Sequence, residues 1–209
     1  MRIGIVGSGM IGATLGELWV KAGHEVFLSS RHPEALKPLV ERLGERARAG
    51  TPEEAAAFGQ VILLAVPFNA AADLGVRLAP VLAGKVVLDA GNPYADRDGT
   101  AAEEVARVGR GSGRWTAQHL PAAHVVKAFN TVYFKTLATA ALRAGDRVGI
   151  PLAGDNAVAL DVAVQLVKDA GFAPVVVGAL DRAKDFDPGT PVFNTGMSGP
   201  ELRRRLGVP

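Results

Sequence analysis

The strongest constraint on the fold is a glycine-rich turn near the start of the chain. Residues 3–6 are a short β-branched run typical of a buried strand, and Gly7, Gly9 and Gly12 follow with the spacing G-x-G-x-x-G. Apolar residues within 11–19 then fall on one face of a helix. In a dinucleotide site, the first glycine allows the tight turn, the second lets a pyrophosphate approach the backbone, and the third lets the helix pack closely. The sequence therefore predicts dinucleotide binding, and the alternative is a glycine turn that only packs a helix on a strand.

The end of the second predicted strand indicates which dinucleotide binds. Ser29, Ser30 and Arg31 follow the strand 24–28, about 20 residues after the turn, where an NAD enzyme places an acid on the ribose 2′-hydroxyl. An acid would repel a 2′-phosphate, whereas a guanidinium attracts it through charge-assisted hydrogen bonds of about 1.5–3 kcal/mol each. We therefore expect NADP(H). The alternative is a solvated turn that caps the helix 33–43, and both can hold together.

The rest of the chain alternates apolar runs with helical patterns. Residues 60–66 are expected to form a central strand buried on both faces, because every residue after Gln60 is apolar. Later strands are expected at 85–90, 124–128, 147–154 and 173–177. This order predicts an α/β fold: a Rossmann-like, doubly wound, mostly parallel sheet in a single domain with a short C-terminal tail. We expect an NADP-binding domain over 1–178 and a tail over 179–209 that completes the substrate side.

Loops at the carboxyl ends of the strands line the ligand crevice of such a sheet. Val66 and Pro67 end the strand 60–66 and are expected against the cofactor, unless Pro67 only stops the strand. Asn92 ends the next strand, where its amide could bind ribose or nicotinamide. Because Asn-Pro is equally a turn signal, a purely structural role for Asn92 stays open.

Polar residues also follow the strand that begins at His124. Lys127, Asn130 and Thr131 are candidates to position a substrate, and no residue is assigned a chemical step. Lys127 alternatively snorkels at a strand end, and Asn130 alternatively caps a helix over Val132–Leu142.

Two segments are less regular. Residues 94–121 include a basic, glycine-rich stretch at 109–113, which we expect to be a flexible surface loop, with closure over a ligand as the alternative. The Gly- and Pro-rich residues 181–209 would border the second substrate together with 94–121. A homodimer formed through either segment stays open.

The composition excludes several kinds of site. The chain has no cysteine, which removes disulfides, thiolate metal sites and cysteine nucleophiles, and its four histidines show no metal-ligand spacing. With 23 Lys+Arg against 21 Asp+Glu and no basic cluster interleaved with aromatics, nucleic-acid binding is not expected. The longest apolar run, 61–68, is far shorter than the roughly 18 residues of a membrane span. We therefore expect a cytoplasmic protein without metal, membrane or nucleic-acid partners.

Several short motifs lie in order along the chain, and they are Gly7-Ser-Gly-Met-Ile-Gly12, Gly23-His-Glu-Val26, Ser29-Ser-Arg31, Ala65-Val-Pro-Phe68, Asp89-Ala-Gly-Asn-Pro93, Val126-Lys-Ala-Phe-Asn-Thr131 and Gly154-Asp155. Together they resemble the NADPH-dependent reductases of the deazaflavin coenzyme F420 (F420H2:NADP oxidoreductases). The Lys-Ala-Phe-Asn-Thr run is the most specific of them, and it is also similar to the reductase domain of membrane ferric reductases.

The resemblance implies an NADP-binding fold in which F420 lies face to face with the nicotinamide and hydride passes directly between two carbons. Such a reaction needs the carbons held about 3–3.5 Å apart rather than a side-chain nucleophile. The resemblance also implies cofactor contacts: Ser8, Gly9, Met10 and Ile11 with the pyrophosphate, Ser30 and Arg31 with the 2′-phosphate, and Val66 and Ala128 packed on the cofactor.

We therefore expect an NADP(H)-dependent oxidoreductase with a small-molecule redox acceptor, which is F420 by resemblance. One alternative is an NADPH-dependent reductase of a flavin, quinone or imine. A second is a non-catalytic NADP(H) sensor. The run Lys127–Thr131 favours an enzyme, because a pure sensor has no evident need for it.

Overall fold

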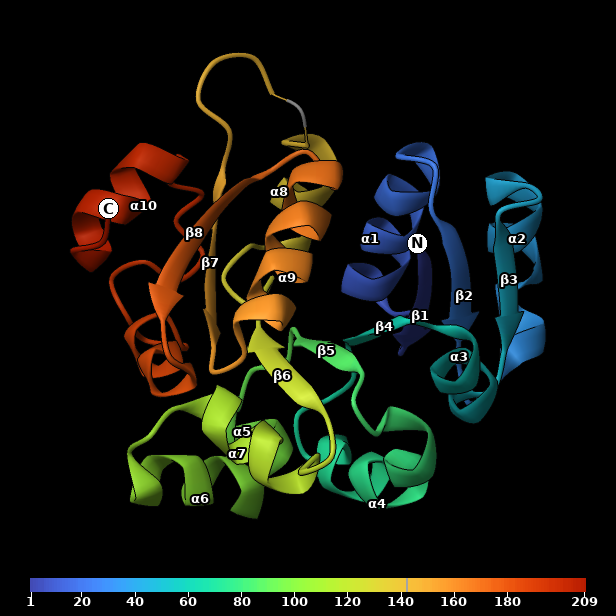
Figure 1. The fold of residues 1–209 in the computed structure, drawn as a ribbon, viewed down its shortest axis with the longest axis horizontal. Coiled ribbons are helices and arrows are strands. Elements are labelled where there is room, and N and C mark those ends of the chain that lie inside the picture. The colour runs from blue at the N-terminus through green and yellow to red at the C-terminus, as the bar shows by residue number, and fades with distance from the viewer. Residues whose placement is uncertain (142) are drawn as a thin grey trace.

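The computed structural model describes residues 1–141 and 143–209, which build an eight-stranded sheet in the order β3-β2-β1-β4-β5-β6-β7-β8 (Figure 1). The strands are β1 (Arg2–Val6), β2 (Glu25–Ser29), β3 (Ala47–Gly50), β4 (Val61–Leu64), β5 (Val86–Asp89), β6 (His124–Lys127), β7 (Gly149–Gly154) and β8 (Ala173–Gly178). The first six strands in the sheet are parallel, whereas β7 runs antiparallel to β6 and parallel to β8. The predicted Rossmann-like, mostly parallel sheet is confirmed.

Helices cover both faces of this sheet, as a doubly wound fold requires. They are α1 (Met10–Lys21), α2 (Lys37–Leu43), α3 (Pro52–Phe58), α4 (Ala70–Leu82), α5 (Ala95–Asp98), α6 (Thr100–Val108), α7 (Ser112–His119), α8 (Phe134–Thr139), α9 (Ala157–Asp169) and α10 (Gly199–Leu206), with 3-10 turns η1 (Pro33–Leu36) and η2 (Leu180–Asp185). Figure 1 shows α1, α8 and α9 on one side of the sheet and α4 to α7 on the other. The helix expected over Val132–Leu142 is observed as α8, and Leu142 lies outside the described residues.

Two apolar cores separate these layers. One packs α1 and α9 on the sheet around Trp19, whose ring meets Phe129 edge-on at 6.0 Å between centroids. The other packs α3, α4 and α7 around Phe68 and Trp115. Strand β4 lies between both cores and is buried along its whole length, which explains its uninterrupted apolar sequence.

The C-terminal segment shares a core with the far end of the sheet. Phe186 and Leu202 are buried against Val175 of β8. The prediction of a flexible surface loop at 109–113 is wrong for its second half, because Gly111, Ser112 and Gly113 are buried and α7 begins at Ser112. A Cβ on Gly113 would come within 2.9 Å of a Leu180 methyl group, so η2 packs directly on this glycine.

Candidate functional site

The glycine turn joins β1 to α1 with little space to spare. Gly7 has φ of +97°, and a Cβ on Gly12 would lie 2.0 Å from the Gly7 carbonyl oxygen. Glycine is therefore required at both positions, for the left-handed backbone and for the close approach of the helix. Gly9 differs, because a Cβ there would meet nothing within 4 Å and the residue faces open space at the start of α1. No side chain caps this helix, so its first N–H groups stay available to an anion.

Two cavities of about 880 and 410 Å³ meet at this turn. Both are lined by Gly9, Ala65, Val66 and Pro67, so they form two lobes of one crevice across the carboxyl ends of the parallel strands. The strand order reverses between β1 and β4, which is where open α/β sheets bind their ligands. We call the 880 Å³ cavity the outer lobe and the 410 Å³ cavity the inner lobe.

The outer lobe contains the predicted 2′-phosphate site. Ser30 and Arg31 line it, Arg31 is exposed, and no ion pair of Arg31 occurs within residues 1–141 and 143–209. Ser29 also borders the lobe, but its hydroxyl is buried, donates to the Ile5 carbonyl at 2.8 Å and accepts from the Gly7 amide at 3.4 Å. Ser29 therefore braces the glycine turn, which leaves Ser30 and Arg31 as the groups available to a ligand.

A second guanidinium lies across the same lobe. Arg77 pairs with Glu53, and both line the cavity. A hydrogen bond from its own backbone amide, together with the bond from Arg77, holds the pKa of Glu53 below its ordinary value. Because Glu53 neutralises Arg77, Arg31 is the cation on this lobe that lacks a carboxylate partner among the described residues.

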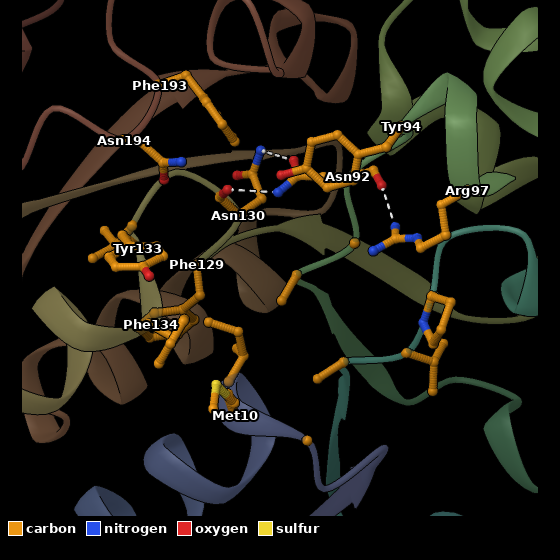
Figure 2. A pocket seen from close by; sticks show the side chains of 18 residues that line it. Met10, Asn92, Tyr94, Arg97, Phe129, Asn130, Tyr133, Phe134, Phe193 and Asn194 are labelled. Atoms are coloured by element: carbon orange, nitrogen blue, oxygen red, sulfur yellow. Dashed lines mark hydrogen bonds between the residues drawn. The ribbon is translucent and has the colours of Figure 1, made fainter.

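The inner lobe is mainly aromatic and apolar (Figure 2). Its large apolar side chains come from α1, from the loops after β5 and β6, from the start of α8 and from the C-terminal segment, and they include Met10, Tyr94, Phe129, Tyr133, Phe134 and Phe193. Its polar side chains are Asn92, Arg97, Asn130 and Asn194. A cavity lined in this way suits a flat, largely apolar ring with a few polar groups at its edge.

Asn92 and Asn130 point toward each other in this lobe (Figure 2). The Asn92 amide donates to the Asn130 carbonyl oxygen at 2.8 Å, and the Asn130 amide donates to Asn92 Oδ1 at 3.2 Å. The preceding residue, Phe129, has φ of +62°, which is unusual for a bulky side chain and costs about 1–2 kcal/mol. Packing of Phe129 against Trp19 and Phe172 holds this strained turn, which brings Asn130 back to the cavity.

Arg97 stands at one edge of the inner lobe, over the ring of Tyr94 at 5.0 Å. Its guanidinium bonds both oxygens of Asp98 and the Asn92 carbonyl oxygen. Burial raises the pKa of Asp98, but hydrogen bonds from Arg97 and from two backbone amides outweigh it and hold that pKa below its ordinary value. The loop after β5 is thus fixed by a buried carboxylate.

Lys127 lies beneath the crevice rather than in it. Its side chain is fully buried, and Nζ donates to Asp89 Oδ2 at 2.9 Å and to the Gly91 carbonyl oxygen. Asp89 also accepts from the Thr116 hydroxyl at 2.7 Å and from the Gly91 amide at 2.8 Å. The amine does not snorkel to solvent as the alternative proposed; it ties β6 to the turn after β5.

The site residues predicted from the sequence divide into two groups. Those that line one or both lobes are Gly7, Ser8, Gly9, Met10, Ile11, Ser29, Ser30, Arg31, Val66, Pro67, Asn92 and Asn130. Those that line neither are Gly12, Lys127, Ala128 and Thr131, all of which are buried. Thr131 instead accepts a backbone hydrogen bond from Asn194 at 2.9 Å and so anchors the C-terminal segment beside Asn130.

Several lining residues carry no motif that predicts them. Tyr133 and Phe134 follow the Lys-Ala-Phe-Asn-Thr run after one residue, and Tyr94 follows Asn92 after one residue, so proximity to a predicted site is the available signal. Phe193 and Asn194 come from a distant part of the chain, and Asn194 has φ of +56°.

Two buried side-chain atoms lack a hydrogen-bond partner in the part of the chain that the structure describes, and both belong to the crevice. They are Ser8 Oγ at the glycine turn and Asn130 Oδ1 in the inner lobe. Buried polar atoms are nearly always paired, so each invites a partner from a bound molecule. Together with the open face of Gly9, these atoms fit a dinucleotide that runs through both lobes.

Comparison with known proteins shows which families the chain resembles. Residues 2–93 match the family described as NADP oxidoreductase coenzyme F420-dependent. The F420-dependent NADP reductase of Methanothermobacter thermautotrophicus is 28% identical over 216 residues, which cover 92% of this chain and 88% of that protein. The chain is thus similar to this family over residues 2–93 and to this reductase over most of its length.

Two further similar proteins differ in how much of their own length the match covers. The metalloreductase STEAP3 of Rattus norvegicus is 30% identical over 189 residues, but the match covers 89% of this chain and only 36% of that protein. The crystal structure of the hypothetical protein SMa0349 from Sinorhizobium meliloti has a TM-score of 0.82, 28% identity and 95% coverage of both chains.

Within the described residues, neither a metal-binding cluster nor a membrane-spanning helix was found. No group of three or more His, Cys, Asp or Glu side chains within the described ranges could hold a metal ion. Among the described helices, none is long and apolar enough to cross a membrane.

Proposed function

We propose that this chain is an NADP(H)-dependent oxidoreductase that transfers a hydride between NADPH and a flat redox acceptor, with coenzyme F420 as the acceptor that the family suggests. The observation that carries the proposal is the two-lobed crevice. One lobe offers phosphate-binding groups and the other offers an aromatic enclosure, and the glycine turn lies where they meet.

The outer lobe supports NADP(H) rather than NAD(H). Arg31 has no carboxylate partner within the described residues, and the Ser30 hydroxyl next to it already accepts from the His32 amide at 3.1 Å and keeps its own proton to donate. A phosphate that receives a charge-assisted hydrogen bond gains about 1.5–3 kcal/mol, which is about 10- to 150-fold in affinity.

The contribution of the protein to the reaction is placement. When bound, NADPH supplies the hydride from its nicotinamide ring. The N–H groups at the start of α1 and the Ser8 hydroxyl hold the pyrophosphate. The aromatic walls of the inner lobe would hold the nicotinamide and the acceptor away from water, and the Asn92–Asn130 pair would form the floor beneath them. No acid, base or nucleophile is needed for transfer between two carbons.

The inner lobe also supports an enzyme over a sensor. A sensor needs space for the dinucleotide alone, whereas here Tyr94, Tyr133 and Phe193 extend the cavity beyond the glycine turn. We further propose that residues 1–178 bind NADP(H), that residues 179–209 complete the acceptor side through Phe193 and Asn194, and that the protein works in the cytoplasm on a small molecule.

Cofactor choice is tested by titration with NADPH and NADH. The wild type is expected to bind NADPH at least about tenfold more tightly than NADH. Arg31→Ala is expected to remove most of this preference and to leave NADH binding nearly unchanged. Arg107→Ala, an exposed arginine on α6 that lines neither lobe, is the matched control for the loss of one positive charge. Equal affinity of the wild type for both nucleotides would refute the role of Arg31.

The acceptor is tested by stopped-flow mixing of the protein with NADP⁺ and reduced F420. Growth of the absorbance band of NADPH is expected. A flat trace with protein that binds NADPH normally would remove F420 and direct the search to flavins, quinones and imines, which fit the same aromatic lobe.

A further inference from the structure

The floor of the inner lobe carries one acceptor that the protein leaves unused. Asn130 is 3% exposed, and within the described residues its Oδ1 has no hydrogen-bond partner. The other half of the same amide is fully engaged, because Nδ2 donates to Asn92 Oδ1 at 3.2 Å and to the Phe186 carbonyl oxygen at 3.3 Å.

The orientation of the Asn130 amide follows from these partners. Asn92 is fixed first, because its Nδ2 donates to the Asn130 main-chain oxygen at 2.8 Å and its Oδ1 must therefore face Asn130. A flipped Asn130 would set its oxygen against two acceptor oxygens, those of Asn92 and Phe186. The free atom is thus the oxygen, and its partner must be a donor.

We propose that Asn130 Oδ1 accepts a hydrogen bond from the carboxamide N–H of the nicotinamide and so sets the orientation of the ring. This inference rests on the proposed function. It assigns to Asn130 the contact that the sequence suggested for Asn92, whose amide nitrogen and oxygen are already bonded to Asn130.

The position of Asn130 favours the nicotinamide over the acceptor as the donor. A dinucleotide with its pyrophosphate at Gly9 enters the inner lobe along Val66 and Pro67, which line both lobes. Its ring then covers the buried floor before any second ring can. The acceptor is left with the more exposed rim, where Tyr94 and Tyr133 are 41% and 46% exposed.

The bond has a consequence for the reaction. A nicotinamide ring held only by stacking could rotate by half a turn and present either face. A buried acceptor that bonds the carboxamide favours one of these two orientations, so the same face of the ring meets the acceptor in every turnover.

The test compares binding of three nucleotides to the intact protein. NADP⁺ carries the carboxamide, thionicotinamide-NADP⁺ keeps an N–H donor, and 3-acetylpyridine-NADP⁺ replaces it with a methyl group. The wild type is expected to bind the first two about equally and the third about tenfold more weakly, because a buried acceptor would be left unpaired. Asn130→Ala is expected to bind all three alike, since the acceptor is gone.

Gln118→Ala serves as the control, because it removes an exposed carboxamide side chain on α7 that lines neither lobe. It is expected to keep the tenfold discrimination. Binding of 2′,5′-ADP, which lacks the nicotinamide, should be unchanged in both variants and reports that the outer lobe is folded.

Each other result overturns the proposal. Equal binding of the acetylpyridine analogue and NADP⁺ by the wild type refutes it without any variant, so a poorly folded Asn130→Ala would not protect it. Unchanged discrimination in Asn130→Ala assigns the donor contact to another residue. Failure of the wild type to bind any of the three would instead refute the proposed function.

Discussion

Replacing Lys127 by methionine tests whether this residue holds the site together from beneath. Methionine keeps the apolar stem that packs near Phe68, whose ring centroid lies 5.7 Å from Nζ, and removes only the amine. Asp89, whose side chain is 2% exposed, would then keep its bonds from Thr116 and the Gly91 amide but lose its positive partner. The Gly91 carbonyl oxygen would lose a donor as well.

The expected loss is large because both groups are inaccessible to water. Breaking a buried ion pair by removing one partner costs about 3–5 kcal/mol, since a charge stays buried without compensation. For a chain of 209 residues, this lowers the midpoint of thermal unfolding by about 6–20 °C. Neutralising Asp89 as well, in the double variant Asp89→Asn/Lys127→Met, should recover at least about 1 kcal/mol.

Urea unfolding followed by far-UV circular dichroism measures the free energy of unfolding of the wild type, of Lys127→Met, of Asp89→Asn and of the double variant. A surface pair, Lys21 and Glu17 on α1, supplies the comparison, and Lys21→Met is expected to cost less than about 1 kcal/mol. A loss below about 1 kcal/mol in Lys127→Met, or a double variant no more stable than the single one, would refute the buried-pair account. It would also reopen a direct role for the amine in the reaction.

Three further predictions follow from other contacts. Gly9→Ala should keep the wild-type melting temperature but weaken NADPH binding in a titration, whereas Gly12→Ala should lower the melting temperature, because its Cβ would lie 2.0 Å from a carbonyl oxygen; equal effects would contradict this distinction. The depressed pKa of Asp98 contributes stability that is present above pH 4 and lost as the pH falls further, so Asp98→Asn should cost about 2 kcal/mol at pH 7 and flatten the acid dependence of urea unfolding; an unchanged acid slope would be the wrong outcome. Phe186→Ala should cost about 3–5 kcal/mol, because the fully buried ring joins the C-terminal segment to the sheet, whereas Asp181→Asn, at two partly exposed ion pairs with Arg110 and Arg114, should cost less than about 2 kcal/mol; comparable losses in calorimetry would show that charges, not packing, hold this segment.

The parts of the fold that could be predicted from sequence are those that depend on short-range residue patterns. The glycine spacing after 3–6 predicts a tight turn with a closely packed helix, because only glycine allows that approach. The continuous apolar run of β4 predicts a strand buried on both faces. Strand β3 was not predicted, since its sequence Ala-Arg-Ala-Gly lacks the β-branched residues that mark strands. The reversed direction of β7 was also not predicted, because strand direction depends on how the chain returns to the sheet and leaves no local signature.

The residues that line the outer lobe could be predicted from the sequence better than those that line the inner lobe. Ser30 and Arg31 line the outer lobe as expected, since their position is set by the length of one strand–helix–strand unit. The burial of Lys127 was not foreseen, because its partner Asp89 lies 38 residues away and pairing depends on strand register. Phe193 reaches the inner lobe only through the packing of the C-terminal segment. Such contacts are set by tertiary structure and not by spacing.

Transfer of a label from NADPH tests the central claim most directly. Protein is mixed with the acceptor and NADPH that carries deuterium on either face of the reactive nicotinamide carbon, and the products are analysed by mass spectrometry. The account predicts that deuterium from one face only appears on a carbon of the acceptor and that none is lost to water. Label released to solvent, or drawn from both faces, would contradict direct transfer between two rings held in one orientation.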